Sequence, residues 1–402
     1  MGYLVLARKW RPQTFDAMTG QEHVVRTLGN AIKGNRVAHA YLFCGPRGVG
    51  KTTAARLLAK ALNCEKGPTP EPCGECRACV EITQGSSIDV AEIDGASNNG
   101  VENVRELREN AKYLPQRDRH RIYIIDEVHM LSTAAFNALL KTLEEPPGHV
   151  KFILATTEPA KLPDTILSRC QRHNFRRIGS AQMLSRLKEI CQAEASGISD
   201  RALSLVVRQS EGGMRDALSL LDQVFSACGE APTDEEVAEA LGAIDRTLVQ
   251  DLAKGLVHRQ VAPLLERVEE AFNRGVDLKR LLEELALELR HVFVAKAMGA
   301  PPKELAELDQ KAVVALGKEA DASQLARLFD VVHGAVRDVS QAAQPKLAVE
   351  MALLKAVHLA PGAAIPELVA KVEKLSQGLP VASAKPSTGA PGGRPAPAPF
   401  RA

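Results

Sequence analysis

The chain has 402 residues, 45% of them hydrophobic, so it can form two or three domains with apolar cores, and it is not a peptide hormone, a fibre or a disordered tail. Its 51 basic and 49 acidic side chains leave a formal net charge of +2, so any nucleic-acid-binding surface must be a local patch. No run of about 18 apolar residues occurs, and Arg8, Lys9 and Arg11 stand where a signal peptide would be apolar. These features predict a soluble, cytoplasmic protein with no membrane partner.

From residue 1 to about residue 178, short apolar runs typical of strands alternate with helical patterns. The predicted strands are Ala40 to Cys44, Ile88 to Asp94, Arg121 to Asp126 and Lys151 to Thr157. Such alternation is typical of an α/β domain in which helices cover both faces of a largely parallel sheet. We therefore predict an α/β fold for this part of the chain.

A glycine-rich motif follows the first predicted strand. Residues 45–52 read Gly-Pro-Arg-Gly-Val-Gly-Lys-Thr, which fits G-x-x-x-x-G-K-[ST], and a predicted helix from Thr52 to Asn63 comes directly after it. In such a loop the backbone N–H groups face phosphates, Lys51 reaches the β and γ oxygens, and the Thr52 hydroxyl can bind Mg²⁺. The motif predicts a nucleoside triphosphate site, with a plain glycine-rich turn as the alternative.

The cysteines divide into a cluster and four isolated residues. Cys64, Cys73, Cys76 and Cys79 have the spacing C-x8-C-x2-C-x2-C within a proline- and glycine-rich loop. Four thiolates fill a tetrahedral Zn²⁺ site, and a site with no open position is structural. Two disulfides and an iron–sulfur cluster are the alternatives. The isolated residues are expected to pack in apolar surroundings; they are Cys44, Cys170, Cys191 and Cys228.

Two acidic residues end the third predicted strand. Asp126 and Glu127 follow the apolar run from Ile122 to Ile125. A carboxylate at the C-terminal edge of a buried parallel strand lies beside the phosphate loop, so we expect Asp126 to hold Mg²⁺ and Glu127 to polarise the attacking water. The alternative is a pair of surface acids that cap the next helix. His129 is given no chemical role.

Further candidates for nucleotide sensing follow in chain order. Thr157 ends the next predicted strand, so its hydroxyl can contact a γ-phosphate or a water. Arg169 follows a short helix, and Arg215 opens a helix of the next domain. Either arginine alone would be read as a solvated or ion-paired side chain. Together with the phosphate loop they fit the arginines that stabilise charge during nucleotide hydrolysis.

After residue 178 the predicted strands disappear. Helical patterns with a break at Gly212 and Gly213 predict a small helical domain over residues 179–243, and a further helical domain covers residues 244–379. Residues 380–402 are rich in Pro, Ala and Gly, and we expect a disordered linker there.

Taken in order, these motifs resemble those of one family. The motifs are Trp10-Arg11-Pro12, the phosphate loop, the four-cysteine insert, Asp94 to Gly100, Asp126 to His129, Ser168-Arg169-Cys170 and Gly213 to Asp216. Over residues 1–360 the chain resembles the gamma/tau subunits of bacterial DNA polymerase III, the AAA+ ATPases of the sliding-clamp loader. The resemblance implies an AAA+ ATPase domain over residues 1–178 with a zinc insert at 64–79, a lid over 179–243 and an oligomerising collar over 244–379.

The resemblance also implies roles for particular residues. Asp126 would serve Mg²⁺, Glu127 would activate water, Thr157 would be a first sensor, Arg215 a second sensor, and Arg169 a finger that completes a neighbouring subunit's site. The ATP-binding residues implied are Ala7, Arg11, Pro12, Gly45, Pro46, Arg47, Gly48, Val49, Gly50, Lys51, Thr52 and Thr53.

The implied function is ATP-driven opening of the beta sliding clamp and its loading onto primer–template DNA, with Asn98 and Arg105 as candidate DNA contacts. The implied partners are the delta and delta prime subunits and further copies of this chain. The family belongs to the polymerase holoenzyme, yet no second pair of carboxylates suited to nucleotidyl transfer is present, and no polymerase- or helicase-binding motif is expected in the linker. The alternatives are another AAA+ machine, such as a Holliday-junction motor or helicase loader, and a non-enzymatic scaffold.

Overall fold

The structure is a computed structural model that describes residues 4–229, 232–302 and 307–358. It divides into two compact units, Met1–Ala243 and Ile244–Ala402, called unit 1 and unit 2 below. The linker predicted over residues 380–402 lies outside the described residues. Among the described residues, no helix combines the length and the apolar character needed to cross a membrane.

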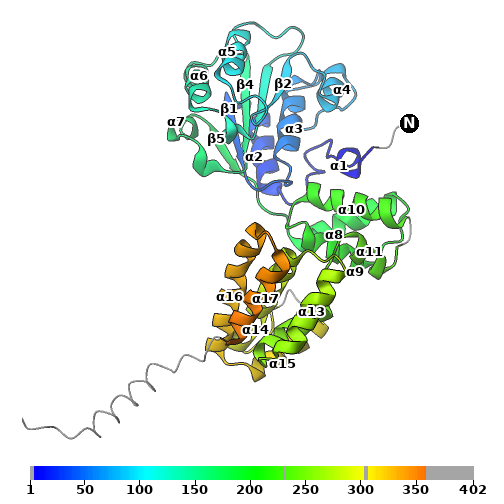
Figure 1. Cartoon of the computed structure of the whole chain (residues 1–402). Helices are drawn as coiled ribbons and strands as arrows, with labels where there is room; N and C mark the ends of the chain where they lie inside the picture. The colour runs from blue at the N-terminus through cyan, green and yellow to red at the C-terminus, as the bar shows by residue number, and fades with distance from the viewer. Residues whose placement is uncertain (1–3, 230–231, 303–306, 359–402) are drawn as a thin grey trace, which may run out of the picture. The chain divides into compact units, whose positions relative to one another are not determined.

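Unit 1 contains a parallel five-stranded sheet with the strand order β2-β3-β4-β1-β5 (Figure 1). The strands are β1 (Ala40–Cys44), β2 (Val90–Asp94), β3 (Arg121–Asp126), β4 (Val150–Thr156) and β5 (Gln171–Asn174). In the register between β2 and β3, Asp94 pairs with Asp126 at the C-terminal edge of the sheet. The acidic residues that end these two strands therefore lie side by side at the edge where ligands bind in such sheets.

The helices of unit 1 cover both faces of the sheet. Successive residues of a strand point to opposite faces, so Tyr41 and Phe43 of β1 pack in the cluster that includes residues of α2 and α3, while Leu42 packs with residues of α5 and α6. Strands buried on both faces read as continuous apolar runs, which is why β1, β3 and β4 stand out in the sequence. The helices concerned are α2 (Glu22–Lys33), α3 (Lys51–Asn63), α4 (Arg77–Gln84), α5 (Val101–Asn110), α6 (Thr133–Glu144) and α7 (Asp164–Leu167).

The parallel sheet between helices confirms the predicted α/β fold class, but β5 was not among the predicted strands. This strand pairs with β1 alone, at the edge of the sheet, and His173 is its one buried residue. The remaining three residues are polar and exposed. A polar edge strand has no apolar run to reveal it, because most of its side chains stay in contact with water.

The last part of unit 1 is helical. Its helices are α8 (Ser180–Ala193), α9 (Asp200–Gln209), α10 (Met214–Cys228) and α11 (Asp234–Ala240). Leu6 of the N-terminal helix α1 (Leu6–Lys9) is buried in the same core as Met183 and Leu221. Helix α1 therefore packs with α8 to α11, and these helices are together called the helical body of unit 1.

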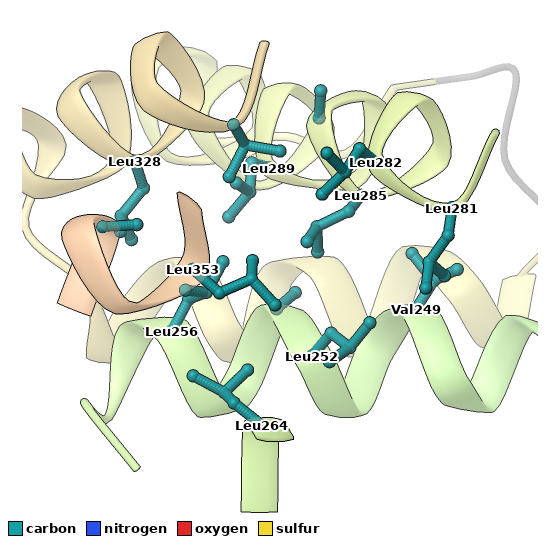
Figure 2. Packing of buried hydrophobic residues seen from close by; sticks show 14 of the residues in the cluster. Val249, Leu252, Leu256, Leu264, Leu281, Leu282, Leu285, Leu289, Leu328 and Leu353 are labelled. Carbon is teal, nitrogen blue, oxygen red and sulfur yellow. The ribbon is translucent and has the colours of Figure 1, made fainter. Parts of the chain in front are cut away.

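Unit 2 is helical throughout its described residues. Its helices are α12 (Arg246–Val257), α13 (Val261–Asn273), α14 (Leu278–Met298), α15 (Glu307–Glu319), α16 (Ala322–Gln341) and α17 (Pro345–His358). Leucines and valines from these helices fill a common core, in which Leu252, Leu285 and Leu289 lie close together (Figure 2). One charged residue interrupts this core: Glu288 is 2% exposed and lies 3.0 Å from the Arg246 guanidinium.

Candidate functional site

The phosphate loop runs from the end of β1 to the start of α3, as the sequence motif requires. Gly50 caps α3 with φ 101°, a left-handed conformation that favours glycine. A Cβ on Gly45 would lie 2.5 Å from the Phe175 carbonyl oxygen, so only glycine fits there. These two glycines let the backbone turn sharply into the helix, whose N-terminal N–H groups form an anion-binding end.

Lys51 is a buried cation at this loop. Its side-chain ammonium donates to the carbonyl oxygens of Gly45 and Pro46, each at 2.8 Å, and the residue is 6% exposed. Burial lowers the pKa of Lys51, while the nearby carboxylates of Glu127 and Asp126 act to raise it. A desolvated ammonium interacts strongly with phosphate oxygens, because little water screens it.

The Thr52 hydroxyl and the Asp126 carboxylate offer two possible oxygen ligands for a metal ion next to Lys51. The Thr52 hydroxyl donates to Asp126 Oδ2 at 2.6 Å, and Asp126 ends β3. Hydroxyl and carboxylate oxygens are the ligands that Mg²⁺ prefers, so this pair fits the predicted magnesium site.

Glu127 is held in an unusual backbone conformation next to this pair. Its φ and ψ are 45° and 46°, a left-handed conformation that is costly for a residue with a side chain. Its Oε2 accepts hydrogen bonds from the Thr157 N–H at 3.2 Å and from the Thr157 hydroxyl at 3.0 Å. Strained residues of this kind are concentrated at functional sites, and Thr157 fixes the carboxylate of this one.

His129 also contacts Glu127, although the sequence analysis gave it no role. Its side chain is 5% exposed, and its Nδ1 lies 3.4 Å from Glu127 Oε2 and 3.0 Å from the Thr156 hydroxyl. Its Nε2 lies 3.3 Å from Glu158 Oε1. The one sequence signal for this contact is its position two residues after Glu127, just beyond the strand end.

These groups open onto a cavity of about 800 Å³ within unit 1. Most of the residues predicted to bind ATP line it, and so do Asp126, Glu127 and Arg215; the lining residues from the ATP-binding set are Ala7, Arg11, Pro12, Arg47, Gly48, Val49, Gly50, Lys51, Thr52 and Thr53. Gly45 and Pro46 do not line it, but their carbonyl oxygens hold Lys51. A volume of several hundred Å³ is typical of a small-molecule site.

The helical body supplies one wall of this cavity. Met214, Arg215 and Leu218 come from α10, and the Arg215 N–H donates to the Gly48 carbonyl at 3.2 Å. The cavity is therefore lined both by the sheet and its flanking helices, called the sheet body, and by the helical body, so an occupant would contact both.

Several lining residues were not among those predicted to bind ATP. Trp10, Arg56, Gln84 and Glu92 also face the cavity, and the Arg56 guanidinium pairs with Glu92 at 2.8 Å. Burial lowers the pKa of Arg11, and the nearby Arg56 and Arg215 lower it further. The cavity is therefore rich in cations, as expected for a site that receives a polyanion.

Besides Gly45, Pro46, Thr157 and the four clustered cysteines, three predicted site residues lie outside the cavity lining. Arg169 pairs with Glu144 at 2.7 Å and donates to the Thr165 carbonyl at 2.8 Å. Arg105 is exposed and pairs with Glu102, while Asn98 is half-buried and donates to the Asp94 carbonyl at 3.1 Å. The roles predicted for these residues involve a neighbouring subunit or DNA, so the single chain leaves them as predictions.

The four clustered cysteines converge as the metal hypothesis requires. Their sulfur atoms all lie within 4.8 Å of one another; the residues are Cys64, Cys73, Cys76 and Cys79. Zn–S bonds of about 2.3 Å in a tetrahedron place sulfurs about 3.8 Å apart, so this set fits zinc after a small contraction. Backbone N–H donors from Cys76 and Glu75 lower the pKa of Cys73 to about 6, whereas burial raises the pKa of Cys79.

The isolated cysteines differ in burial. Cys44 and Cys191 are buried, as predicted, whereas Cys170 and Cys228 are partly exposed. Burial nevertheless raises the pKa of Cys170 to about 12. A thiol with a raised pKa is a poor nucleophile near neutral pH, and Cys170 packs against the apolar cluster that includes Leu162 and Ile166, as predicted.

Family models match nearly the whole described chain. Their descriptions are "DNA polymerase III, delta subunit" for residues 20–179, "DNA polymerase III clamp loader subunit, ATPase lid domain" for residues 182–230, and "DNA polymerase III subunits gamma and tau domain III" for residues 233–372.

Curated relatives agree with these models. The tau subunit of DNA polymerase III from Bacillus subtilis is 42% identical over 94% of this chain and 68% of its own length. The Escherichia coli tau subunit is 43% identical over 91% of this chain and 57% of its own length, and the Buchnera aphidicola gamma subunit is 37% identical over 89% and 98%. The chain thus spans about half to two thirds of the length of the tau relatives.

Solved structures resemble the chain more distantly. The Thermotoga maritima RuvB Holliday junction branch migration motor is 19% identical and has a TM-score of 0.44, covering 67% of this chain and 86% of that one. A likeness of that degree carries no information about activity.

Proposed function

The chain belongs to the family of DNA polymerase III gamma/tau subunits, which are AAA+ ATPases, and we propose that it is the ATP-hydrolysing subunit of a sliding-clamp loader. In this role ATP binding and hydrolysis drive the loading of the beta clamp onto primer–template DNA. One observation carries the proposal: Lys51, the Thr52–Asp126 pair and Arg215 line the same cavity, although they come from separate parts of the sequence.

The triphosphate is the part of ATP that this cavity recognises best. The loop N–H groups and the N-terminus of α3 face its phosphates, and the ammonium of Lys51 exchanges two carbonyl acceptors for phosphate oxygens. Thr52 and Asp126 would hold Mg²⁺, which would neutralise negative charge on the phosphates. Arg215 contacts the same nucleotide from α10, so binding draws the sheet body and the helical body together.

Hydrolysis requires a water held in line with the γ-phosphate. Glu127 accepts a proton from that water, and Thr157 sets the orientation of the carboxylate through its two hydrogen bonds. Thr157 thereby acts as a positioning residue that couples strand β4 to the chemistry. His129 supports the same carboxylate from a second side.

Arg169 is proposed to complete the site of a neighbouring subunit. Its guanidinium is half-buried and pairs with Glu144 of its own chain, so contact with a neighbour's γ-phosphate requires this pair to open. A site without its neighbour's arginine then hydrolyses ATP on the order of 10³-fold more slowly than a completed site. The proposed neighbours are the delta and delta prime subunits and further copies of this chain.

DNA and zinc have supporting roles in this proposal. Asn98 and Arg105 are proposed to contact the sugar–phosphate backbone of primer–template DNA, which makes binding independent of base sequence and sensitive to salt. The four clustered cysteines would hold Zn²⁺, which would fix the loop between α3 and α4 and take no part in the chemistry.

The proposal is tested by ATP binding to the Lys51→Ala variant. Removal of the ammonium leaves the triphosphate without its buried counter-charge, and we expect a loss of affinity of at least about 100-fold. Lys33→Ala, which changes an exposed lysine at the end of α2, is the control and should bind as the wild type does. Unchanged ATP affinity in Lys51→Ala would show that the nucleotide site is wrongly assigned.

A further inference from the structure

Helix α3 connects the two sites that the sequence presents as separate. Its first residue is Lys51 of the phosphate loop, and its last residue, Asn63, directly precedes Cys64 of the cysteine cluster. A helix of 13 residues is about 20 Å long, so the two sites lie at opposite ends of one rigid element. Any group that contacts α3 between its ends can respond to both.

Gln13 is such a group, and it contacts α3 through Lys60. Lys60 is 2% exposed, and its ammonium donates to the Gln13 side-chain oxygen at 2.8 Å and to the Gln13 backbone carbonyl at 3.3 Å. Burial lowers the pKa of Lys60. A buried ammonium is stable only when acceptors replace its water, so Lys60 fixes the position of Gln13.

Helix α4 contacts the same glutamine. The Thr83 hydroxyl lies 3.3 Å from Gln13 Oε1 and 2.8 Å from the carbonyl of Cys79, one of the four clustered cysteines. Cys76 caps the N-terminus of α4, and the other end of the helix, at Gln84 and Gly85, lines the nucleotide cavity. The position of α4 therefore depends on the cysteine cluster at one end and shapes the cavity at the other.

Gln13 then reaches the wall of the cavity. Its amide nitrogen donates to the Arg11 carbonyl at 3.0 Å, and Arg11 and Pro12 line the cavity. The side chain of Gln13 thus joins three elements: α3 through Lys60, α4 through Thr83, and the cavity wall through Arg11.

We propose that Gln13 is a positioning residue for nucleotide binding, and that through it the cysteine cluster and the nucleotide cavity are energetically coupled. Zinc on the four cysteines holds α4 in place, α4 and Lys60 hold Gln13, and Gln13 holds the Arg11–Pro12 wall against the nucleotide. This inference rests on the proposed nucleotide site. Coupling between two binding sites is reciprocal, so ATP must tighten zinc binding by the same factor by which zinc tightens ATP binding.

The test measures the ATP dissociation constant of the full chain, with and without zinc, for the wild type, Gln13→Ala and Gln171→Ala. Trp10 is the one tryptophan of the chain and lines the cavity, so its fluorescence reports directly on this wall. Gln171 is an exposed glutamine on edge strand β5 and provides the matched control. The zinc dissociation constant is measured in parallel, with and without ATP, by competition with a chromogenic chelator.

We expect zinc removal to weaken ATP binding by the wild type and by Gln171→Ala about fivefold, the effect of one or two net hydrogen bonds. Gln13→Ala should show a similar loss with zinc present and little further loss when zinc is removed, because the link is already broken. Wild-type ATP affinity in zinc-loaded Gln13→Ala, or a full zinc response in that variant, overturns the inference. If the zinc-loaded wild type does not bind ATP at all, the proposed function itself is wrong.

A second variant decides the matter if the zinc-free chain does not fold. Thr83→Val keeps the shape of the side chain and removes the hydroxyl, and in the zinc-loaded protein we expect it to weaken ATP binding about twofold to threefold. The double variant of Gln13→Ala and Thr83→Val should bind ATP no more weakly than Gln13→Ala alone. Additive losses in the double variant contradict the inference, since they would mean that the two residues act independently.

Discussion

The two units both bury charged side chains, but they neutralise them differently. In unit 1 the buried Lys51 meets backbone carbonyl oxygens at the edge of a cavity, with the carboxylates of Asp126 and Glu127 nearby. In unit 2 the buried Glu288 is matched by the guanidinium of Arg246, which also pairs with Asp309 at 3.2 Å. Charge that faces a cavity is available to a ligand, whereas a charge buried in a helical core is costly to leave without its partner. This difference is consistent with the proposal that the nucleotide chemistry takes place in unit 1.

The largest expected effect concerns the role proposed for Glu127 of unit 1 in ATP hydrolysis. In Glu127→Gln the side chain keeps its shape but can no longer accept a proton from water, so we expect ATP turnover to fall about 10²- to 10⁴-fold. ATP binding should persist, because Lys51 and the phosphate loop are unchanged. Steady-state turnover and equilibrium ATP binding, measured on the same preparation, check the two expectations.

Glu106→Gln, an exposed change on α5, is the control for charge removal and should leave turnover unaltered. Full turnover in Glu127→Gln would mean that another group activates the water, and the role given to this residue would have to be abandoned.

The next prediction concerns the matched charges of unit 2. Arg246→Met removes the partner of Glu288 and leaves a carboxylate buried without its counter-charge, which should lower the free energy of unfolding by about 3–5 kcal/mol. The midpoint of urea unfolding, followed by far-UV circular dichroism, measures this loss. Since the change lies in the other unit, ATP affinity should stay that of the wild type.

Arg290→Met replaces an exposed arginine on α14, the helix that carries Glu288, and serves as the matched control. A small loss in Arg246→Met, equal to that in the control, would show that the ion pair is not needed for packing. Loss of ATP binding in Arg246→Met would contradict the expectation that a change in unit 2 leaves the nucleotide site of unit 1 unaltered.

The smallest expected effect is a pH-dependent attachment of α1. Glu194 accepts from Lys9 Nζ at 2.8 Å and from the Trp10 indole at 2.6 Å, and the hydrogen bond from Lys9, followed by that from Trp10, lowers its pKa. Because its pKa is lower in the folded protein, the stabilisation is fully present above about pH 4.5, the unfolded value, and is lost as the pH falls through the folded pKa.

Acidification below about pH 4.5 should therefore release Trp10 from Glu194, with a change in the emission of this tryptophan. In Glu194→Gln the acidic step should disappear. A step that persists unchanged in that variant would have to come from another carboxyl group.

Local sequence signals sufficed for much of unit 1. The β1 and β3 strands were predicted with their observed bounds, because strands buried on both faces read as apolar runs and the phosphate loop marks the end of one of them. The polar edge strand β5 gave no such signal. Likewise His129 could not be connected to Glu127 from the sequence, since a histidine beyond a strand end contacts whatever the next strand brings to it.

What the sequence determined by itself was the set of candidate groups: a glycine-rich loop whose pattern predicts a phosphate site, two carboxylates at a strand end, and four closely spaced cysteines. What the tertiary structure decided was which distant residues contact these groups. Lys60 donates a hydrogen bond to Gln13, Thr157 donates one to Glu127, and α10 brings Arg215 to the cavity. Periodicity and motifs report on neighbours along the chain, whereas these contacts join segments far apart in sequence and exist only once burial and hydrogen bonding have fixed the packing.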